Sequence, residues 1–410
     1  MKTLLMNSSA IPVSADDRRR LRPVSRDNDS FQMMLRGYQQ MAIWADELGY
    51  DAYGSTEHHF QIEGGESIPN NLLVYAKLAA LTKQIMFVPM SVVVTSHDPL
   101  RVAEDLALFS HMFPGRLGVA FARGFQTRWL QTLSQAENVV AADPRSDAAN
   151  REKFDEYLLI IEKAWSEDSF TFAGSHYQVP FPATGIPNWP LADWTREYGA
   201  PGDVDDAGTI RRIGVTPKPL ERPPIFIPST RSEQTIIDSA LHGRTLVVAA
   251  AGRDRIRYVA KTYRDAGREA GRALRLGENI AVVAKISLGD TFEEAFELAV
   301  QTSGFWYQNI FQNFWFNEGY RRDTDPPQRP LRLADERALT QRMYESGQLL
   351  CGTVDQVHDQ MDKMVNEFAG GPIDWIVWES WTQSMPFPDW EGVQRYQLET
   401  YAKHLMPAFR

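Results

Sequence analysis

The sequence predicts an α/β fold, a (β/α)₈ TIM barrel with insertions, on three observations. Strand-like apolar runs alternate with amphipathic helical segments, which indicates a parallel sheet. The alternation gives about eight strand-then-helix units, and eight units in one chain favour a closed barrel over an open sheet. A chain of 410 residues with 43% hydrophobic residues can also fill one large core. We therefore expect a single domain over 1–410, with insertions at about 167–222 and 304–347.

Individual elements follow from local patterns. Apolar residues recur at helical spacing from Phe31 to Leu48, and Gly49 ends that helix, while Pro99 marks the first turn of another. A hairpin is expected at 170–179. The expected strands are 3–6, 50–56, 84–95, 115–122, 225–228, 245–250, 280–287 and 373–378. The expected helices are 31–48, 71–82, 99–111, 151–165, 232–242, 254–270, 292–302, 354–368 and 391–404.

Composition narrows the function classes. The 43 Lys and Arg against 53 Asp and Glu give a net charge of -10, which disfavours nucleic acid and anionic membranes as partners. Cys351 is alone, so no internal disulfide or cysteine-based zinc site can form, and a buried apolar role is expected for it. There is no apolar run of membrane-spanning length and no export signal at the start, so we expect a cytoplasmic location.

Polar motifs follow three of the expected strands, where a barrel of this class places its chemistry. They are Glu57-His58-His59-Phe60, His97-Asp98-Pro99 and Arg123-Gly124. Neighbouring side chains of an extended chain point to opposite faces, so only one of His58 and His59 can point into a pocket. Either histidine taken singly could equally be a structural residue. A metal is not expected, because the spacing lacks His-x-x-x-His and no cysteine assists.

Two segments could hold an anion. Arg123 beside Gly124 presents guanidinium donors suited to a phosphate, although a surface ion pair is an equal alternative. Thr230 and Glu233 have capping-box spacing around Arg231, and a helix start attracts phosphate, with plain capping as the alternative. Gly-x-Gly-x-x-Gly, Walker A and Gly-x-Ser-x-Gly motifs are missing from the sequence, so a Rossmann NAD site, a P-loop and an α/β-hydrolase have no support.

In combination these motifs resemble the bacterial luciferase-like flavin monooxygenase family. The similarity is dense over about 1–135, patchy over 150–250 and sparse from there until 350. The motifs that carry it are Thr56-Glu57-His58-His59-Phe60, Asn71-Leu72, Ser96 to Asp105, Gly115-Arg116-Leu117-Gly118, Ala122-Arg123-Gly124 and Gly352 to Val357. The resemblance implies a barrel that binds reduced FMN (FMNH2), which reacts with O2 to a flavin C4a-hydroperoxide that oxygenates an organic substrate.

The resemblance also assigns residues. It implies that His58 is the catalytic histidine beside the flavin and that Arg123 grips the phosphate. Met90-Ser91 falls where the family often has a non-proline cis peptide, which we expect here. The positions that the resemblance assigns to cofactor binding are Glu57, Met90, Ser91, Arg123, Arg231, Ser232 and Thr235.

Departures from the light-emitting members bear on the substrate. Ala122 stands where they carry a reactive cysteine and Arg231 where they carry glutamate, while Ala249, Ala250 and Ala251 replace a bulkier region. We therefore expect a bulkier substrate than a long-chain aldehyde, such as a ketone or an aromatic natural product. The aromatic run 305–316 could line an apolar pocket that excludes water, or be an insertion packed on the barrel, or a dimer contact.

No second dinucleotide site is visible, so we expect a separate flavin reductase to supply FMNH2, and we expect a homodimer. Two alternatives remain open. The chain could be a deazaflavin-dependent oxidoreductase on a related barrel, which would transfer hydride and ignore O2. It could also be a non-catalytic flavin-binding partner subunit, although the presence of both His58 and Arg123 argues against this.

Overall fold

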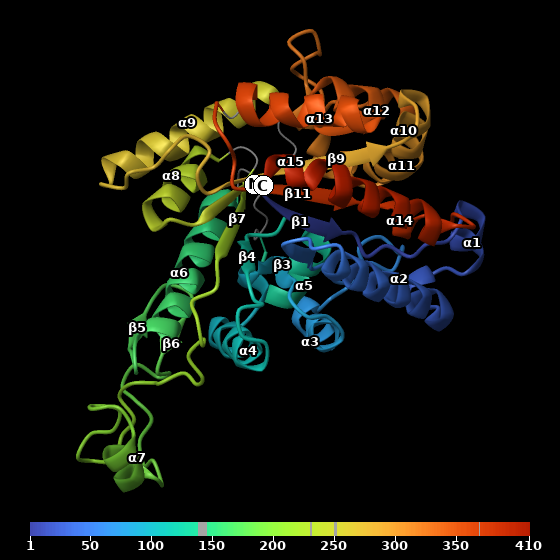
Figure 1. Cartoon of the computed structure of the whole chain (residues 1–410). Coiled ribbons are helices and arrows are strands. Elements are labelled where there is room, and N and C mark those ends of the chain that lie inside the picture. Colours follow the sequence, from blue (N-terminus) through green and yellow to red (C-terminus); the bar gives the residue numbers. More distant parts are fainter. Residues whose placement is uncertain (138–145, 230–231, 250–251, 369) are drawn as a thin grey trace. The chain divides into compact units, whose positions relative to one another are not determined.

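The computed structural model has eight parallel strands that close into a barrel surrounded by helices (Figure 1). It describes residues 1–137, 146–229, 232–249, 252–368 and 370–410. Around the barrel the strands run β1, β2, β3, β4, β7, β8, β9 and β11, and β11 pairs with β1 to close the ring. Their bounds are β1 Lys2–Asn7, β2 Ala52–Ser55, β3 Met86–Val93, β4 Val119–Ala122, β7 Ile225–Ser229, β8 Thr245–Val248, β9 Ile280–Leu288 and β11 Trp375–Ser380. The predicted barrel and all eight of its predicted strands are confirmed.

The predicted helices lie close to their expected ranges, with differences at their ends, whereas α1, α5, α7, α11, α12 and α15 were not predicted. Asp27 and Asp98 cap α2 and α4 by accepting backbone N–H bonds, and Pro99 occupies the first turn of α4 as expected. Gly49 has the positive φ of 76° expected of a residue that ends a helix. The helices are α1 Ala15–Arg20, α2 Asn28–Glu47, α3 Asn71–Leu81, α4 Pro99–Met112, α5 Thr127–Ser134, α6 Asp147–Ser166, α7 Ala192–Tyr198, α8 Glu233–His242, α9 Arg253–Glu269, α10 Phe292–Ala299, α11 Phe305–Asn309, α12 Glu336–Glu345, α13 Val354–Lys363, α14 Trp390–Thr400 and α15 Met406–Phe409.

One strand was not predicted. β10 (Leu349–Gly352) pairs in parallel with the C-terminal half of β9, whose N-terminal half pairs with β8. It is only four residues long and lies just after the second predicted insertion (304–347), between α12 and α13, where we expected only the helix 354–368. Gln360 of α13 binds both the N–H and the carbonyl of Cys351, which fastens β10 to the next helix.

The barrel interior is apolar on the amino-terminal side of Lys285 and Glu379. Alternate residues of the strands point inward and form one buried cluster, as the two-residue period of a strand requires. Its members are Leu4, Met6, Ala52, Val88, Met90, Ala120, Phe226, Val247, Ala281, Val283, Trp375 and Val377. Gly54 of β2 fits beside this cluster because a Cβ there would lie 2.7 Å from the carbonyl oxygen of Val88 and 2.9 Å from Cγ of Met90. β2 and β3 can therefore pack closely just before the segment that carries His58.

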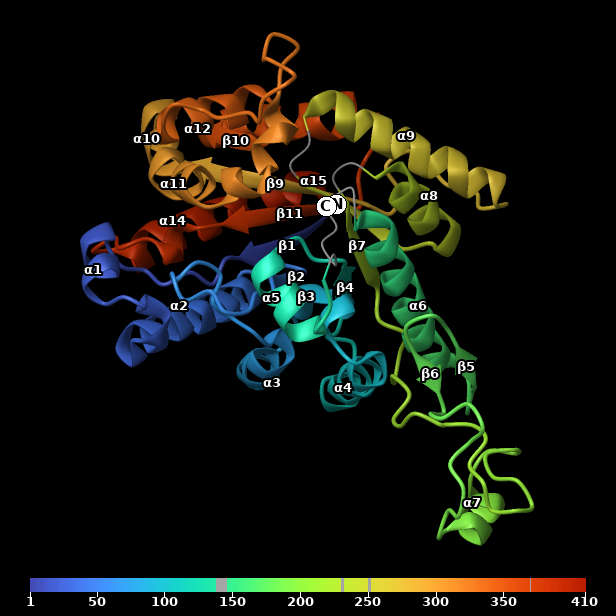
Figure 2. The same ribbon diagram turned by 180° about the vertical axis from the view of Figure 1, so that it is seen from behind.

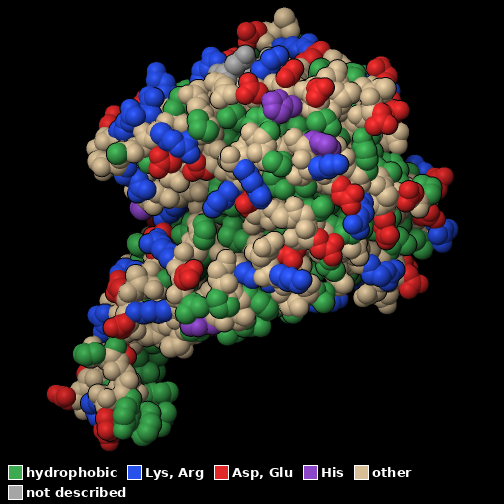
Figure 3. All heavy atoms as spheres, viewed as in Figure 1, with side chains coloured by type: hydrophobic (Ala, Val, Ile, Leu, Met, Phe, Trp, Pro, Cys, Tyr) green, Lys and Arg blue, Asp and Glu red, His purple; other side chains and the backbone are tan. Residues whose placement is uncertain are grey.

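The contacts divide the chain into two compact units. Unit 1 comprises 1–91, 118–120 and 224–410, and unit 2 comprises 92–117 and 121–223. Unit 2 contains the predicted hairpin, β5 (Phe172–Ala173) with β6 (Gln178–Val179), beyond which the chain forms α7 (Figure 2). α7 has no buried residue, and apolar side chains gather on the surface around it (Figure 3). No helix in the described part of the chain combines the length and apolar character needed to cross a bilayer.

Candidate active site

The segment after β2 carries two histidine–carboxylate pairs. Nε2 of His58 lies 3.1 Å from Oε2 of Glu66, and both side chains are almost fully buried. The other oxygen of Glu66, Oε1, accepts a hydrogen bond of 2.6 Å from Thr56 Oγ1. Nε2 of His59 lies 2.9 Å from Oε1 of Glu57. The two neighbouring histidines therefore have different carboxylate partners, in keeping with the alternation expected from an extended chain.

Backbone contacts hold this segment in shape. The N–H of His58 donates to the carbonyl of Ile68, and Asn71 Nδ2 donates to the carbonyl of Ser55 at the end of β2. Glu66 has a positive φ of 48°, an uncommon conformation for a residue with a side chain. A buried carboxylate is costly unless it is paired, so the His58 and Thr56 contacts stabilise Glu66 in this position.

Met90 and Ser91 lie on the adjacent strand β3 and are both buried. The peptide bond between them is cis, as expected from the resemblance. The pairing of Ser55 with Pro89 places them in register with the segment that begins after β2. Glu57, His58, Met90 and Ser91 therefore belong to two adjacent strand ends of unit 1.

Arg123 follows β4 in unit 2 and forms an ion pair. Its Nη1 lies 2.7 Å from Oδ1 of Asp147, the first residue of α6, and its side chain is 17% exposed. Asp147 also lies 3.9 Å from Arg151 Nη2. Burial lowers the pKa of Arg123, and the nearby Arg151 cation lowers it further, while Asp147 acts in the opposite direction. Two cations therefore crowd around one carboxylate at this strand end.

The predicted helix start after β7 is only partly as expected. α8 begins at Glu233, and Ser232 is its N-cap, accepting from the Thr235 N–H at 3.3 Å. The predicted capping pair of Thr230 and Glu233 is therefore wrong, because Ser232 already occupies the cap position. Arg231, Thr230, Ala250 and Ala251 lie outside the described residues. Ser232 and Thr235 belong to unit 1, whereas Arg123 belongs to unit 2.

A charged cluster inside the barrel was missed by the sequence analysis. Lys285 of β9 and Glu379 of β11 are both buried, with Nζ 2.9 Å from Oε2. Lys285 Nζ also donates to the Tyr307 hydroxyl at 2.8 Å, and that hydroxyl lies 3.0 Å from Oε2 of Glu379. Lys285 could have been recognised in the sequence, because it lies two residues after Val283 and four after Ala281, and therefore faces inward like them in a mostly apolar strand. Glu66 and Tyr307 could not be recognised in this way, since both lie outside the strands.

The surroundings of these groups determine which of them carry a charge. Burial opposes the ammonium and is the largest single effect, but Glu379 and Tyr320 together outweigh it and raise the pKa of Lys285 above its ordinary value. Burial, followed by the charge of Glu379, raises the pKa of Tyr307 well above its usual range. Lys285 is therefore a cation at neutral pH, and Tyr307 is a neutral hydroxyl that accepts from the lysine and donates to the glutamate.

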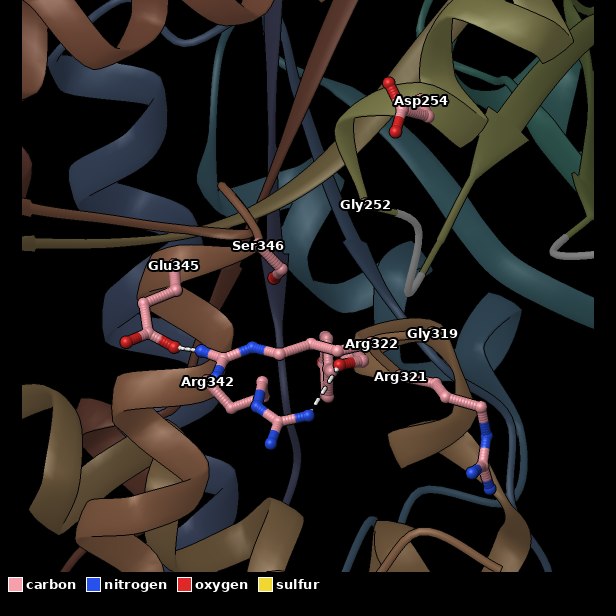
Figure 4. A pocket seen from close by; sticks show the side chains of 9 residues that line it. Gly252, Asp254, Gly319, Arg321, Arg322, Arg342, Glu345 and Ser346 are labelled. Carbon is pink, nitrogen blue, oxygen red and sulfur yellow. Dashed lines mark hydrogen bonds and ion pairs between the residues drawn. The ribbon is translucent and has the colours of Figure 1, made fainter. Parts of the chain in front are cut away.

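A separate cavity of about 210 Å³ lies in unit 1 between the start of α9, residues 319–322 and the end of α12 (Figure 4). None of the sequence-predicted site residues lines it. Its arginines are paired: Arg342 with Asp325, Arg321 with Glu318 and Arg322 with Glu345. Small-molecule sites usually enclose roughly 300–1,000 Å³, so this cavity is not our candidate for a flavin site.

The fold is a closed parallel barrel with polar side chains at the ends of its strands, where TIM-barrel enzymes place their active sites. A family model described as luciferase-like monooxygenase matches residues 24–369. The chain therefore belongs to the luciferase-like monooxygenase family, and it is a flavin-dependent monooxygenase.

Individual relatives match this chain at low sequence identity. The chain is similar to 3,6-diketocamphane 1,6-monooxygenase of Pseudomonas putida, with 25% identity over 345 residues, which cover 80% of this chain and 82% of the relative. A solved type II Baeyer-Villiger monooxygenase, the oxygenating constituent of 3,6-diketocamphane monooxygenase from Pseudomonas putida in complex with FMN, aligns with a TM-score of 0.71, 20% identity and 100% and 99% coverage. An F420-dependent secondary alcohol dehydrogenase aligns with a TM-score of 0.60, 14% identity and 100% and 99% coverage. At these identities the two structures show the shared fold.

Cys351 provides a test of burial near the charged cluster. Its thiol is buried on β10, and burial raises its pKa to about 12. Because a raised pKa keeps the thiol protonated, the thiolate is scarce at any pH below this value. We expect iodoacetamide at pH 8 to leave the native protein unlabelled and to label one site after unfolding in urea, as measured by intact mass. Rapid labelling of the folded protein would contradict the buried position.

Proposed function

We propose that this protein binds reduced FMN, supplied by a separate reductase, and uses O2 to oxygenate a ketone. The observation that carries the proposal is the buried His58–Glu66 pair at the carboxyl end of β2, in a chain of the luciferase-like family. The name of the diketocamphane relative supports a cyclic ketone as substrate, and the name of the similar solved structure supports a Baeyer-Villiger oxygen insertion as reaction. Both the ketone and the insertion are proposals for this chain.

The residues present fit a flavin phosphate. Arg123 and Arg151 share Asp147, and the mutual repulsion of the two cations would be relieved by a bound dianion. The start of α8, where the Ser232 hydroxyl caps the helix, is a second place that favours an anion. We propose that Arg123, Arg231, Ser232 and Thr235 bind the phosphate and that Glu57, Met90 and Ser91 lie against the ring.

Bound reduced FMN would supply the electrons that activate O2. The chain's own contribution centres on His58. Its Nε2 faces the Glu66 carboxylate, which favours a proton on that nitrogen and leaves Nδ1 of the neutral ring as the proton acceptor. We propose that His58 accepts or returns a proton at Nδ1 during the reaction, while the buried surroundings exclude water.

The remaining expectations are proposals of the same kind. We propose that the two compact units form one barrel domain, since β3 and β4 each contribute residues to both. We also propose a homodimer in the cytoplasm. A flavin reductase, O2 and a small organic substrate are the proposed partners.

Oxygen uptake tests the function. The purified protein with FMN, NADH and an added flavin reductase should consume O2 and form a lactone when a 3,6-diketocamphane-type bicyclic diketone is supplied. Without the reductase, NADH oxidation should not occur. Hydride transfer from reduced F420 to the diketone without O2 uptake would contradict the proposal and establish the deazaflavin alternative.

Replacement of His58 tests its catalytic role. His58→Ala should bind FMN normally but should lower the lactone formed per NADH by at least about tenfold, with H2O2 released instead, because proton transfer by a placed group contributes about 10²–10⁴-fold. His176→Ala, at an exposed histidine of unit 2, is the control. Normal coupling in His58→Ala would remove His58 from the mechanism.

Replacement of Arg123 tests the phosphate site. Arg123→Ala should raise the dissociation constant of FMN by about 10- to 100-fold, the effect of losing one charged hydrogen bond. Riboflavin, which lacks the phosphate, should bind both proteins equally. Arg101→Ala, at an exposed arginine of α4, should change neither constant. An unchanged FMN constant in Arg123→Ala, measured by fluorescence titration, would refute the assignment.

A further inference from the structure

The aromatic run 305–316 is packed on the barrel for much of its length. Trp306, Tyr307 and Phe311 are each no more than 5% exposed, and Trp306 stacks on Trp381 with ring centroids 5.4 Å apart. Trp381 directly follows β11, the strand that carries Glu379. The sequence left a pocket lining, packing on the barrel and a dimer contact open for this run. For these three residues the structure shows packing on the barrel.

A polar anchor fixes α11 within this aromatic packing. The Tyr307 hydroxyl lies between Lys285 of β9 and Glu379 of β11, accepting from one and donating to the other. Lys285 Nζ also lies 4.1 Å from the centroid of the Tyr307 ring. Apolar packing alone is non-directional, whereas these hydrogen bonds set the position of α11 along the two strands.

The same short helix touches the loop that carries His58 and Glu66. A Cβ on Gly65 would lie 2.6 Å from Cδ1 of Ile310, the residue that ends α11, and 3.6 Å from Cζ3 of Trp306. The end of α11 thus rests directly on the backbone beside Glu66. Glu66 also contributes to the raised pKa of Tyr307, after the larger effects of burial, Glu379 and Tyr320.

A second contact ties the loop to the helix from the other side. The Arg18 guanidinium lies over the Trp306 ring at 5.5 Å from its centroid. The same guanidinium donates to the backbone carbonyls of Glu63 and Ile11. The loop 57–68 is therefore held against α11 at Gly65 and through Arg18.

We propose that Tyr307, held between Lys285 and Glu379, is a positioning residue for His58: it fixes α11 against Gly65 and so fixes the Glu66 carboxylate that orients the imidazole. This inference rests on the proposed function only for the role of His58 in the reaction. The chain of contacts runs from Lys285 and Glu379 through Tyr307 and Ile310 to Gly65 and Glu66. Each of its members lies in unit 1.

Hydrogen exchange of the ligand-free protein tests the contact chain without any assay of activity. Tyr307→Phe removes the hydroxyl and keeps the ring, and it should speed amide exchange in residues 57–68 by about tenfold, because losing a buried hydrogen bond favours local opening. Tyr50→Phe is the matched control: Tyr50 is equally buried and its hydroxyl donates to the Leu398 carbonyl. It should leave exchange in 57–68 unchanged.

Two double variants separate the hydrogen bond from the charges. Lys285→Met with Glu379→Gln removes both charges but keeps an oxygen that can accept from the Tyr307 hydroxyl. Lys285→Met with Glu379→Leu removes the acceptor as well. Removing both members of a buried ion pair avoids a lone buried charge, so both proteins should fold. We expect near wild-type exchange in 57–68 for the first and fast exchange for the second.

The yield of lactone per O2 consumed then tests whether the contact chain affects the reaction. Tyr307→Phe should lower lactone formed per O2 consumed by about three- to tenfold with an unchanged FMN dissociation constant, and Tyr50→Phe should not. Unchanged exchange or unchanged coupling in Tyr307→Phe would overturn the inference, as would equal effects from Tyr50→Phe or from the two double variants. If wild-type protein shows no flavin-dependent O2 uptake while the exchange results hold, the proposed function fails and the anchoring of the loop by Tyr307 stands.

Discussion

The barrel interior changes from apolar to charged within one inward step along two neighbouring strands. On β9 the step runs from Val283 to Lys285, and on β11 from Val377 to Glu379. The inward side chains that precede this step along the strands form a buried apolar cluster, in which an unpaired charge would be costly. The charges are therefore confined to the carboxyl ends of the strands and must pair there, and this requirement brings Tyr307 and with it α11 onto the barrel.

The need to pair a buried charge also applies to the loop after β2. Glu66 is a second buried carboxylate, and it is satisfied by His58 and Thr56 instead of by a lysine. The carboxyl end of the barrel thus holds buried carboxylates with different partners: Glu379 pairs with Lys285, whereas Glu66 and Glu57 pair with His58 and His59. In the function and the inference proposed above, the Lys285 pair anchors α11 and the His58 pair takes part in proton transfer.

Much of this fold could be predicted from local patterns. The eight strands follow from apolar runs of strand length, and the end of α2 at Gly49 and the start of α4 at Pro99 follow from short-range residue preferences. β10 could not be predicted, because four residues without a repeat around them carry too little signal. The predicted helix 232–242 agrees with α8, and the structure adds that Ser232 is its N-cap.

The sequence by itself determined the barrel, the family and the positions of His58 and Arg123 at strand ends, because strand periodicity and short motifs are local properties of the chain. Only the tertiary structure decided the partners: Glu66 for His58, Asp147 for Arg123, and Tyr307 for Lys285 and Glu379. Tyr307 and Glu379 are 72 residues apart in the chain. Pairing of buried charges depends on which groups the closed barrel brings within hydrogen-bond distance, and no local pattern encodes that distance.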